Sequence, residues 1–499
     1  MEHIIEAILN FAHPLTLLFV FVGSLWGLVA GSLPGISAAM AVILMLPFTY
    51  GMDGIQSIIV LVAVYVTAMC GGSFSAILLK TPGTPAAVAT TFDGYPLTLQ
   101  GKASRALGLA ITGSAVGGIL SGIILVVCAP LLARWALRFQ SAEFFALALL
   151  GLSCIASIGS SNPLKAMISG CMGLLFSTVG LDAFSGNPRY TFGTFYLMSG
   201  IDFVPVMIGA YAVAEVLRNI TEGKKGSSVT GDGKTVKAEL IGIRHIVKNW
   251  VVYIKSSVIG TVVGIIPAAG GSIAALISYG EAARSSKTPE KFGKGAEEGV
   301  IAAEAANNAA AGGSLVPTLT LGIPGGNVTA ILLAAFTMHG LTPGPLLLIN
   351  QPSLLYSVLL GIVAASLLLF VLGSFISRQF SRITSVPYPL LGTLILTLGV
   401  IGSFALRNSI VDVYIMFGFC FLGYFFDKYK YSTSSFILGM ILGSIAENGL
   451  RRQLMVSGGD WSTFFTRPIS LIVILLAVIS FASPYYRAWR KKKQSEKAA

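Results

Sequence analysis

The sequence has little charge. Aspartate, glutamate, lysine and arginine together make up 11% of its 499 residues, whereas hydrophobic residues make up 54%. An ordinary globular chain carries about 25% charged residues, because a soluble surface needs that charge to interact with water. The shortage excludes a disordered chain, a cytosolic enzyme and a nucleic-acid binder. It predicts an all-α, polytopic membrane protein.

Cysteine is scarce as well, and the sequence has no CxxC pair. The five cysteines stand singly in apolar stretches, at Cys70, Cys128, Cys154, Cys171 and Cys420. Isolated cysteines in such stretches are typical of small packing residues rather than of metal ligands or disulfides.

Enzymatic motifs are missing too. Neither HExxH nor GxSxG occurs, and Gly233-Lys234-Thr235 has Ser228 where a phosphate-binding loop needs a glycine. We therefore expect no enzyme and no bound cofactor. Since nothing in the chain is expected to hydrolyse ATP, concentrative transport has to use an ion gradient.

Basic residues are concentrated in two stretches, 218–255 and 487–499. Basic segments beside apolar ones mark the cytoplasmic side of a membrane, so we expect both stretches inside the cell and no nucleic acid as a partner. No Lys or Arg occurs through Ala30, so a cleavable signal peptide is not expected. We therefore predict a cytoplasmic C-terminus and a periplasmic N-terminus. Arg451 and Arg452 disagree with this orientation, because it places them on the outer side.

Long apolar runs recur along the chain, and a membrane span needs about 20 such residues. We expect about 12 transmembrane helices, at 15–31, 54–79, 107–132, 142–160, 163–181, 202–217, 251–267, 353–377, 388–405, 410–426, 434–446 and 467–484. Three further apolar segments are short or broken, at 36–48, 86–92 and 315–338, and segments of this kind are as likely to be re-entrant as to span the membrane.

The two halves of the chain share motifs in the same order. The first half has Gly27-x3-Gly31, Gly71-Gly72-Ser73 and Pro82-Gly83, and the second has Gly260-x3-Gly264, Gly312-Gly313-Ser314 and Pro324-Gly325. The link between the halves and the tail are both predicted inside, and the helix 467–484 has no counterpart in the first half. Without that helix the second repeat starts inside and ends outside, whereas the first ends inside and, with an equal number of crossings, starts outside. The two structural repeats are therefore predicted to be inverted. The expected organisation is a first transmembrane repeat 1–218, a basic cytoplasmic linker 219–250, a second repeat 251–452, an extra helix 453–486 and a basic tail 487–499.

Proline and glycine are expected to break helices at matching places in both halves. A broken helix leaves backbone N–H and C=O groups unpaired, which is tolerated in a membrane only inside protein or beside a wet cavity. Helix N-termini then suit an anion, and free carbonyls suit a cation such as sodium. The candidate substrate- and ion-binding residues are Pro34, Gly35, Ser37, Gly71, Gly72, Ser73, Thr81, Pro82, Gly83, Thr84, Pro267, Gly270, Gly271, Ser272, Asn307, Asn308, Gly312, Gly313, Ser314, Thr318, Pro324, Gly325, Gly326 and Asn327.

Plainer interpretations stand beside this one. Glycine and alanine also permit close helix packing without any ligand. Lys80 either attracts a carboxylate or extends to the membrane interface, and Glu304, near Asn307, is the best functional candidate among the acidic residues. His339 is predicted to be structural, and Asp93-Gly94-Tyr95-Pro96 is predicted to form a turn.

The motifs resemble the large membrane subunit of the tripartite tricarboxylate transporters, the TctA family, over about residues 15–450. The stretches that carry the resemblance are Gly31-Ser32-Leu33-Pro34-Gly35-Ile36, 80–87 (Lys-Thr-Pro-Gly-Thr-Pro-Ala-Ala), 92–97 (Phe-Asp-Gly-Tyr-Pro-Leu), 264–270 (Gly-Ile-Ile-Pro-Ala-Ala-Gly) and 321–325 (Leu-Gly-Ile-Pro-Gly).

The resemblance implies a subunit of a bacterial inner-membrane importer of carboxylates such as citrate, driven by a sodium or proton gradient. It implies two protein partners, a small four-helix membrane subunit and a periplasmic solute-binding protein, with membrane lipid around them. A homodimer is one candidate oligomeric state.

The expected mechanism places the two broken hairpins, 71–92 and 312–338, face to face near the midplane with the breaks at 32–37 and 266–272, around a carboxylate and one or more sodium ions. One part of the protein then moves against the rest, as in an elevator. A channel or scaffold subunit without alternating access is the alternative, and turnover rate separates the two because a channel conducts far faster.

Overall fold

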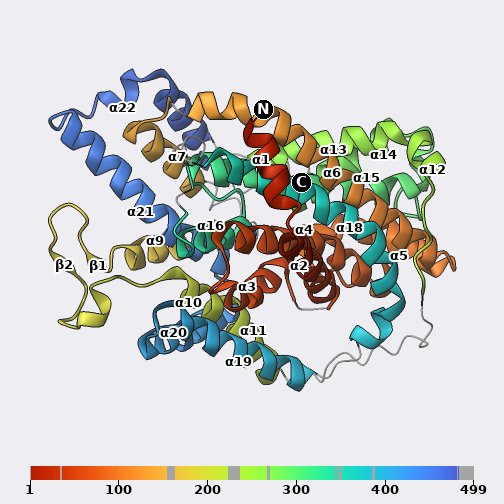
Figure 1. Cartoon of the computed structure of the whole chain (residues 1–499), viewed down its shortest axis with the longest axis horizontal. Helices are drawn as coiled ribbons and strands as arrows, with labels where there is room; N and C mark the ends of the chain where they lie inside the picture. The colour runs from red at the N-terminus through yellow and green to blue at the C-terminus, as the bar shows by residue number, and fades with distance from the viewer. Residues whose placement is uncertain are drawn as a thin grey trace, which may run out of the picture. The chain divides into compact units, whose positions relative to one another are not determined.

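The computed structural model describes residues 2–33, 36–136, 138–153, 163–222, 236–266, 270–341, 343–344, 347, 351–384, 388–479 and 481–482 (Figure 1). Helices form nearly all of the regular structure in these ranges. The exception is a short antiparallel pair of strands, β1 (Gly180–Leu181) and β2 (Pro188–Arg189).

Seven of the described helices are long and apolar enough to cross a membrane, and six shorter apolar helices accompany them. The seven span Pro14–Ser32, Gly54–Leu79, Ala103–Val127, Phe203–Thr221, Pro352–Phe380, Pro389–Arg407 and Ile410–Lys428. The prediction of an all-α polytopic membrane protein is therefore confirmed.

The chain separates into two compact units, each of which takes one segment from either side of the predicted linker. Unit 1 contains Met1–Arg134 and Glu215–Leu406, and unit 2 contains Trp135–Ala214 and Arg407–Ala499. The predicted repeats cut the chain differently, at the linker, so each repeat contributes its first part to unit 1 and its last part to unit 2. The predicted repeats stay a prediction.

The first segment of unit 1 is built on glycines that let two long helices touch. Its elements are α1 (Glu2–Phe11), α2 (Pro14–Ser32), α3 (Ala38–Thr49), α4 (Gly54–Leu79), η1 (Pro85–Ala87), α5 (Val88–Leu99) and α6 (Ala103–Ala136). A Cβ at Gly27 would lie 2.4 Å from the Val64 carbonyl oxygen, and one at Gly31 would lie 2.3 Å from that of Ala68. Side chains at these positions would therefore force α2 away from α4.

The second segment of unit 1 repeats this packing. Its elements are α11 (Ala214–Thr221), α12 (Ile243–Lys248), α13 (Trp250–Ile265), α14 (Gly270–Ser285), η4 (Pro289–Lys291), α15 (Glu297–Leu321), α16 (Asn327–Met338), α18 (Pro352–Thr384) and α19 (Tyr388–Arg407). A Cβ at Gly260 would lie 2.4 Å from the Ala306 oxygen, and one at Gly264 would lie 2.5 Å from the Ala310 oxygen. The helix α13 thus meets α15 as α2 meets α4.

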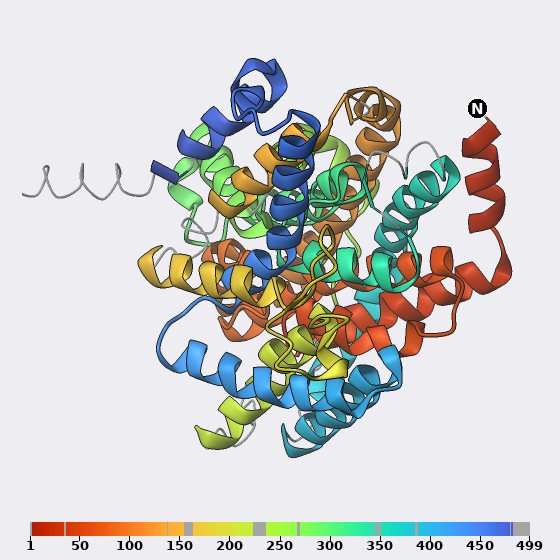
Figure 2. The same cartoon turned by 90° about the vertical axis from the view of Figure 1, so that its left-hand side faces the viewer.

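Contacts between the two segments hold unit 1 together. The helix α3 packs on α16, and α14 packs on α5 and η1. The N-terminal helix α1 runs beside α18 (Figure 2). Part of the predicted linker also packs on unit 1, because the backbone N–H of Glu239 donates to the Ser104 carbonyl oxygen at the start of α6.

Unit 2 combines short and long helices with a charged cluster. Its elements include α7 (Ser141–Ser153), α9 (Pro163–Ser177), η2 (Phe195–Leu197), α10 (Phe203–Met207), the π-helix η3 (Ile208–Val213), α20 (Ile410–Lys428), α21 (Thr433–Val456) and α22 (Thr463–Thr466), and the β1–β2 hairpin projects from the end of α9 (Figure 1).

Arg451 in α21 binds Asp182 at 2.6 Å and Glu447 at 2.9 Å. The hydrogen bond from Arg451, with those from the backbone N–H groups of Ser185 and Phe184, lowers the pKa of Asp182. The charge of Arg451, which disagreed with the predicted orientation, is therefore balanced locally.

Candidate functional site

The first proline-glycine motif interrupts a helix as predicted. The helix α4 ends at Leu79, and Lys80 takes a left-handed backbone conformation with φ 56°, in which its N–H donates to the Ser75 carbonyl oxygen. The chain then runs through Thr81 and Pro82 before η1 begins at Pro85. Proline has no N–H and cannot continue the ladder, so the local sequence accounts for the break.

The second motif breaks α15 in the same way. The helix ends at Leu321, and Gly322 is left-handed with φ 68°, its N–H donating to the Pro317 carbonyl oxygen. After Pro324, the helix α16 begins at Asn327. Lys80 thus corresponds to Gly322, Pro82 to Pro324 and Pro85 to Asn327, at one constant offset along the chain.

The glycine that follows each proline folds back onto the preceding helix. The N–H of Gly83 donates to the Gly72 carbonyl oxygen at 3.1 Å. A Cβ at Gly83 would lie 2.9 Å from the Gly72 Cα, and one at Gly325 would lie 2.8 Å from the Ser314 Cα. Each break is therefore a close turn against its own helix, with no space for a side chain.

Two adjacent amides occupy the middle of α15 without adequate partners. Asn307 and Asn308 are both fully buried. Neither polar atom of the Asn308 side chain has a hydrogen-bond partner among the described residues, and Asn307 Oδ1 has none either. Asn307 Nδ2 lies 3.5 Å from the Met69 carbonyl oxygen on α4. Leaving buried polar groups unpaired costs about 1–3 kcal/mol each, so these amides indicate a site that a ligand, an ion or water completes.

The surroundings of Asn307 bring three of the predicted segments together. A Cβ at Gly271, in the first turn of α14, would lie 2.6 Å from Asn307 Oδ1 and 3.4 Å from the Ala86 Cβ in η1. The Thr84 hydroxyl, just before η1, is buried and also has no partner among the described residues. We name Thr84, Gly271, Asn307 and Asn308 the amide site.

Other predicted residues lie elsewhere in unit 1 or serve the packing. A Cβ at Gly71 would lie 2.7 Å from the Leu28 oxygen, one at Gly313 would lie 2.4 Å from the Thr261 oxygen, and one at Gly312 would lie 2.3 Å from Ser121 Oγ. These three glycines allow neighbouring helices to approach closely. Gly270 has a positive φ of 64° at the start of α14, two residues before Ser272, and Gly326 N–H donates to Thr329 Oγ1 beside Asn327.

The predicted hydroxyl ligands mostly bond to their own backbone. Ser73 donates to the Cys70 oxygen, Thr318 to the Ser314 oxygen and Thr81 to the Leu79 oxygen. Ser314 donates to the Ala311 oxygen and lies 3.2 Å from the Tyr65 hydroxyl of α4. Ser37 caps α3 by accepting from the Met40 N–H. Pro34, Gly35 and Pro267 lie outside the described residues.

The predicted turn at 93–96 is wrong. These residues belong to α5, and Asp93 is fully buried. Its Oδ1 accepts from the N–H groups of Gly295 and Ala296 at 2.8 Å each, and its Oδ2 accepts from the Tyr279 hydroxyl at 2.9 Å. Asp93 therefore stabilises the start of α15, where helix N–H groups lack internal partners. Lys80 lies over the Tyr95 ring, and His339 contacts Thr49 at 3.2 Å, as a structural residue does.

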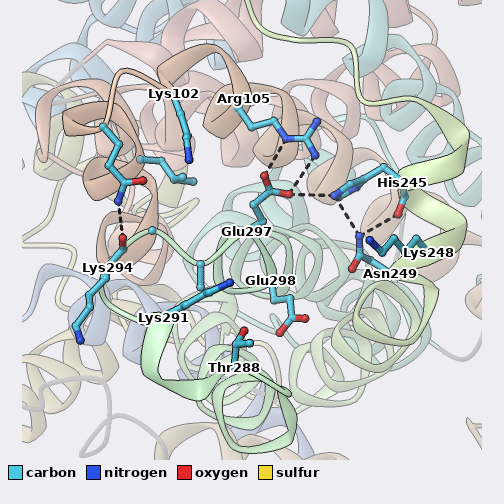
Figure 3. A pocket seen from close by; sticks show the side chains of 14 residues that line it. Lys102, Arg105, His245, Lys248, Asn249, Thr288, Lys291, Lys294, Glu297 and Glu298 are labelled. Carbon is cyan, nitrogen blue, oxygen red and sulfur yellow. Dashed lines mark hydrogen bonds and ion pairs between the residues drawn. The ribbon is translucent and has the colours of Figure 1, made fainter.

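A cavity of about 680 Å³ opens at the N-terminal end of α15 (Figure 3). We name it the basic cavity because most of its charged lining is cationic, with Lys102, Arg105, Lys248, Lys291 and Lys294 against Glu297 and Glu298; His245 also lines it.

Glu297 joins Arg105 to His245 in one chain of contacts, through distances of 3.0 Å and 3.1 Å, while the Lys294 side chain points away from them (Figure 3). Arg105 also binds Glu239 at 2.6 Å. No sequence motif marks this cavity, because its residues come from separate segments that only the fold brings together.

Comparisons with known proteins agree with the sequence motifs. The family model described as the tripartite tricarboxylate transporter TctA family matches residues 17–438. An uncharacterised 52.8 kDa protein of the TAR-I ttuC' 3' region of Agrobacterium vitis is 34% identical over 492 residues, which cover 96% of this chain and 95% of that protein. A second uncharacterised protein, of the TAR-II ttuC' 3' region, is 35% identical over 220 residues, covering 44% of this chain and 91% of its own. No solved structure matches the chain.

Proposed function

This chain belongs to the tripartite tricarboxylate transporter TctA family, the large membrane subunits of these transporters. We propose that it imports a di- or tricarboxylate by alternating access, coupled to a sodium or proton gradient. The observation that carries the proposal is the pair of buried amides with unused hydrogen-bonding atoms, Asn307 and Asn308, beside the first helix break. Membrane proteins retain such costly groups where they bind something.

The amide site has the chemistry for a carboxylate. An asparagine side chain donates two hydrogen bonds through Nδ2 and accepts through Oδ1. The first turn of α14, at Gly271, brings backbone N–H groups and the positive end of a helix dipole to the same place, which favours an anion. The carbonyl oxygens freed at the breaks, and Asn307 Oδ1, are ligands of the kind that a sodium ion takes.

The division into two units supports the elevator-like part of the proposal. Both broken hairpins and the amide site lie in unit 1. The matching contacts of α2 with α4 and of α13 with α15 support two repeats. The equivalent helices α4 and α15 run antiparallel where they touch, since Tyr65 contacts Ser314 while Met69, four residues later, contacts Asn307. This opposite direction supports repeats that are inverted. We propose that unit 1 is the part that moves.

The proposed setting is the bacterial inner membrane, with the C-terminus in the cytoplasm and the N-terminus in the periplasm. A small four-helix membrane subunit and a periplasmic solute-binding protein complete the proposed transporter, which the family description as tripartite supports. The basic stretches of the sequence support the orientation.

The test is uptake into proteoliposomes that contain this chain with its small membrane subunit, with the binding protein added outside. Radiolabelled citrate, succinate, malate and fumarate are each offered under an inward sodium gradient, an inward proton gradient, both or neither. We expect accumulation of at least one of them that depends on one gradient. Uptake of every carboxylate without dependence on either gradient contradicts the coupling.

The rate of uptake tests alternating access. A transporter that closes around each substrate turns over slowly, since such conformational steps take microseconds to milliseconds or longer, whereas a channel conducts much faster and dissipates the gradient. Current through a planar bilayer far above the vesicle turnover rate would favour the channel alternative.

A further inference from the structure

Two carboxylates are fully buried where α5 packs on α15, and their surroundings differ. Asp93 accepts two backbone N–H groups and a tyrosine hydroxyl at the start of α15. Hydrogen bonds of this kind from a helix N-terminus compensate a negative charge. Glu304 lies further along α15, beyond the first turn, where every backbone N–H is used by the helix itself.

Among the described residues, the hydrogen-bond partners of Glu304 are two hydroxyl groups. Thr90 on α5 donates to Glu304 Oε1, and Ser114 on α6 donates to Glu304 Oε2 at 2.8 Å. Among the described residues no lysine, arginine or histidine forms an ion pair with it. A charge buried in this way is costly, and taking up one proton removes the charge while both hydroxyls can still bond to the acid.

Of the other titratable groups on and around α15, one thiol, that of Cys70, interacts with Glu304. In the described part of the chain, the elements packed against α15, and α15 itself, carry Tyr65, Cys70 and Lys80 (α4 and its cap), Asp93 and Tyr95 (α5), Arg105 (α6), Tyr253 and Lys255 (α13), Tyr279, Glu281 and Arg284 (α14), His339 (after α16), Tyr356 and Arg378 (α18), and Glu297 and Glu298. Of these, Cys70 interacts electrostatically with Glu304.

The packing around Glu304 favours a proton over a metal ion. A Cβ at Gly113 on α6 would lie 3.2 Å from the Glu304 Cβ and 3.3 Å from the Ile301 carbonyl oxygen. The two hydroxyls and the carboxylate offer few oxygens, and a hard cation needs a shell of them. A proton needs no such shell.

Glu304 also lies between the basic cavity and the amide site. Glu297, which lines the cavity, is seven residues before Glu304, so both lie on one face of α15 at a separation of about 10 Å. Asn308 follows Glu304 by four residues, one turn further on the same face. The charge of Glu304 therefore acts about one turn, or roughly 6 Å, from the amides that are proposed to hold the carboxylate.

We infer that Glu304 is the binding site of a coupling proton. The carboxylate takes a proton from water on the side from which substrate enters, forming the neutral acid. After the site has changed sides it returns that proton to water. While Glu304 is neutral, it does not repel an anion at Asn307 and Asn308. This inference rests on the proposed function and selects the proton from the two ions considered there.

The direct test needs no substrate. The pH-difference infrared spectrum of the purified wild-type chain in lipid is expected to show the C=O stretching band of a protonated carboxylic acid that titrates. The Glu304→Gln variant is expected to lose that band, because glutamine keeps the shape and cannot titrate. Glu290→Gln is the matched control, because Glu290 is exposed in η4 and does not line the basic cavity, and it is expected to retain the band. A band unchanged in Glu304→Gln overturns the inference.

The transport test uses the vesicles described above with radiolabelled citrate, or with whichever carboxylate of the panel is taken up. Stimulation by an inward proton gradient is expected to be lost in Glu304→Gln, whereas exchange of labelled for unlabelled carboxylate continues. Glu290→Gln is expected to keep both. Proton-driven accumulation by Glu304→Gln, or a wild type driven by sodium with no effect of the proton gradient, contradicts the inference and leaves the proposed function standing. A wild type that takes up none of the carboxylates contradicts the proposed function instead.

A fold control completes the design. Thermal unfolding in detergent shows whether Glu304→Gln is folded. If it is not, Glu304→Asp, which retains a titratable group, decides the question. A shifted pH profile of its uptake supports the inference, and a profile identical to the wild type refutes it.

Discussion

The helices α4 and α15 are built on one plan but differ in what they carry. In the register set by the two breaks, Lys80 matches Gly322, and the glycines that touch α2 and α13 match as well, with Gly71 opposite Leu28 and Gly313 opposite Thr261. In this register, three polar residues of α15 correspond to apolar or aromatic residues of α4. Glu304 corresponds to Val62, Asn307 to Tyr65 and Asn308 to Val66.

This difference teaches that the packing framework and the chemistry are separate properties. The shared glycines set how closely the helices approach in both halves, and they require no ligand. The buried acid and amides occur in α15 and are replaced by apolar or aromatic residues in α4. The function is therefore expected to respond unequally to equivalent substitutions in the two helices, whereas stability is expected to respond equally.

The largest effect is expected when the central amide of α15, Asn308, is made apolar like the corresponding residue of α4. In Asn308→Leu, uptake is expected to fall about 10- to 150-fold, since a hydrogen bond to a charged group contributes about 1.5–3 kcal/mol. The melting temperature is expected to stay level or rise, because two unpaired buried atoms are removed. Proteoliposome uptake and thermal unfolding measure the two effects.

The control lies at the equivalent position of α4. Val66→Ile changes volume without polarity and is expected to leave uptake near the wild-type rate. Normal uptake by Asn308→Leu would show that the unpaired amide takes no part in transport.

The shared framework can be tested by adding one methyl group in each half. A Cβ at Gly31 or at Gly264 would lie within 2.5 Å of a carbonyl oxygen of the facing helix. Gly31→Ala and Gly264→Ala are therefore each expected to lower the free energy of unfolding by about 1–3 kcal/mol, as overpacking does. Thermal unfolding in detergent is the measurement.

Gly280→Ala is the matched control, because nothing lies within 4 Å of its added Cβ on α14. It is expected to be neutral or slightly stabilising, since alanine favours a helix over glycine by up to about 1 kcal/mol. A large loss of stability in only one of the two framework variants would mean that the halves are not built alike.

The smallest expected effect concerns the residue of α4 that matches Asn307. Tyr65→Phe removes the hydroxyl that lies 3.2 Å from Ser314 Oγ. Unfolding free energy is expected to fall by about 1 kcal/mol, and uptake is expected to remain near the wild-type rate. A loss of uptake as great as that of Asn308→Leu would place Tyr65 in the amide site and erase the difference between the two helices.

The sequence predicted the helix breaks because their cause is local. Proline lacks an N–H, and the glycine after it fits against the preceding helix, so the ends of α4 and α15 follow from a few adjacent residues. The register between the halves was one residue off in the Gly-Gly-Ser motifs. The helix contacts match Gly71 with Gly313, whereas the order of residues within the motifs matches Gly71 with Gly312.

The parts that sequence did not reveal depend on distant contacts. The turn expected at Asp93 is helical because Asp93 bonds to the start of α15, and that packing outweighs the local turn preference of Asp-Gly-Tyr-Pro. The partners of Glu304 come from α5 and α6, far away in the chain. No local pattern marks Thr90 or Ser114, since a hydroxyl on a helix usually bonds to its own backbone.

In unit 1, each hairpin packs on a helix of the other segment, and this has a consequence for the order of assembly. The helix α14 of the second segment packs on the first hairpin, and α3 of the first segment packs on the second hairpin. Because synthesis runs from the N-terminus, α3 is already made when the second hairpin emerges, whereas α14 is made long after the first hairpin. The first hairpin, 71–92, therefore lacks its contacts with α14 until more than a hundred further residues have been synthesised.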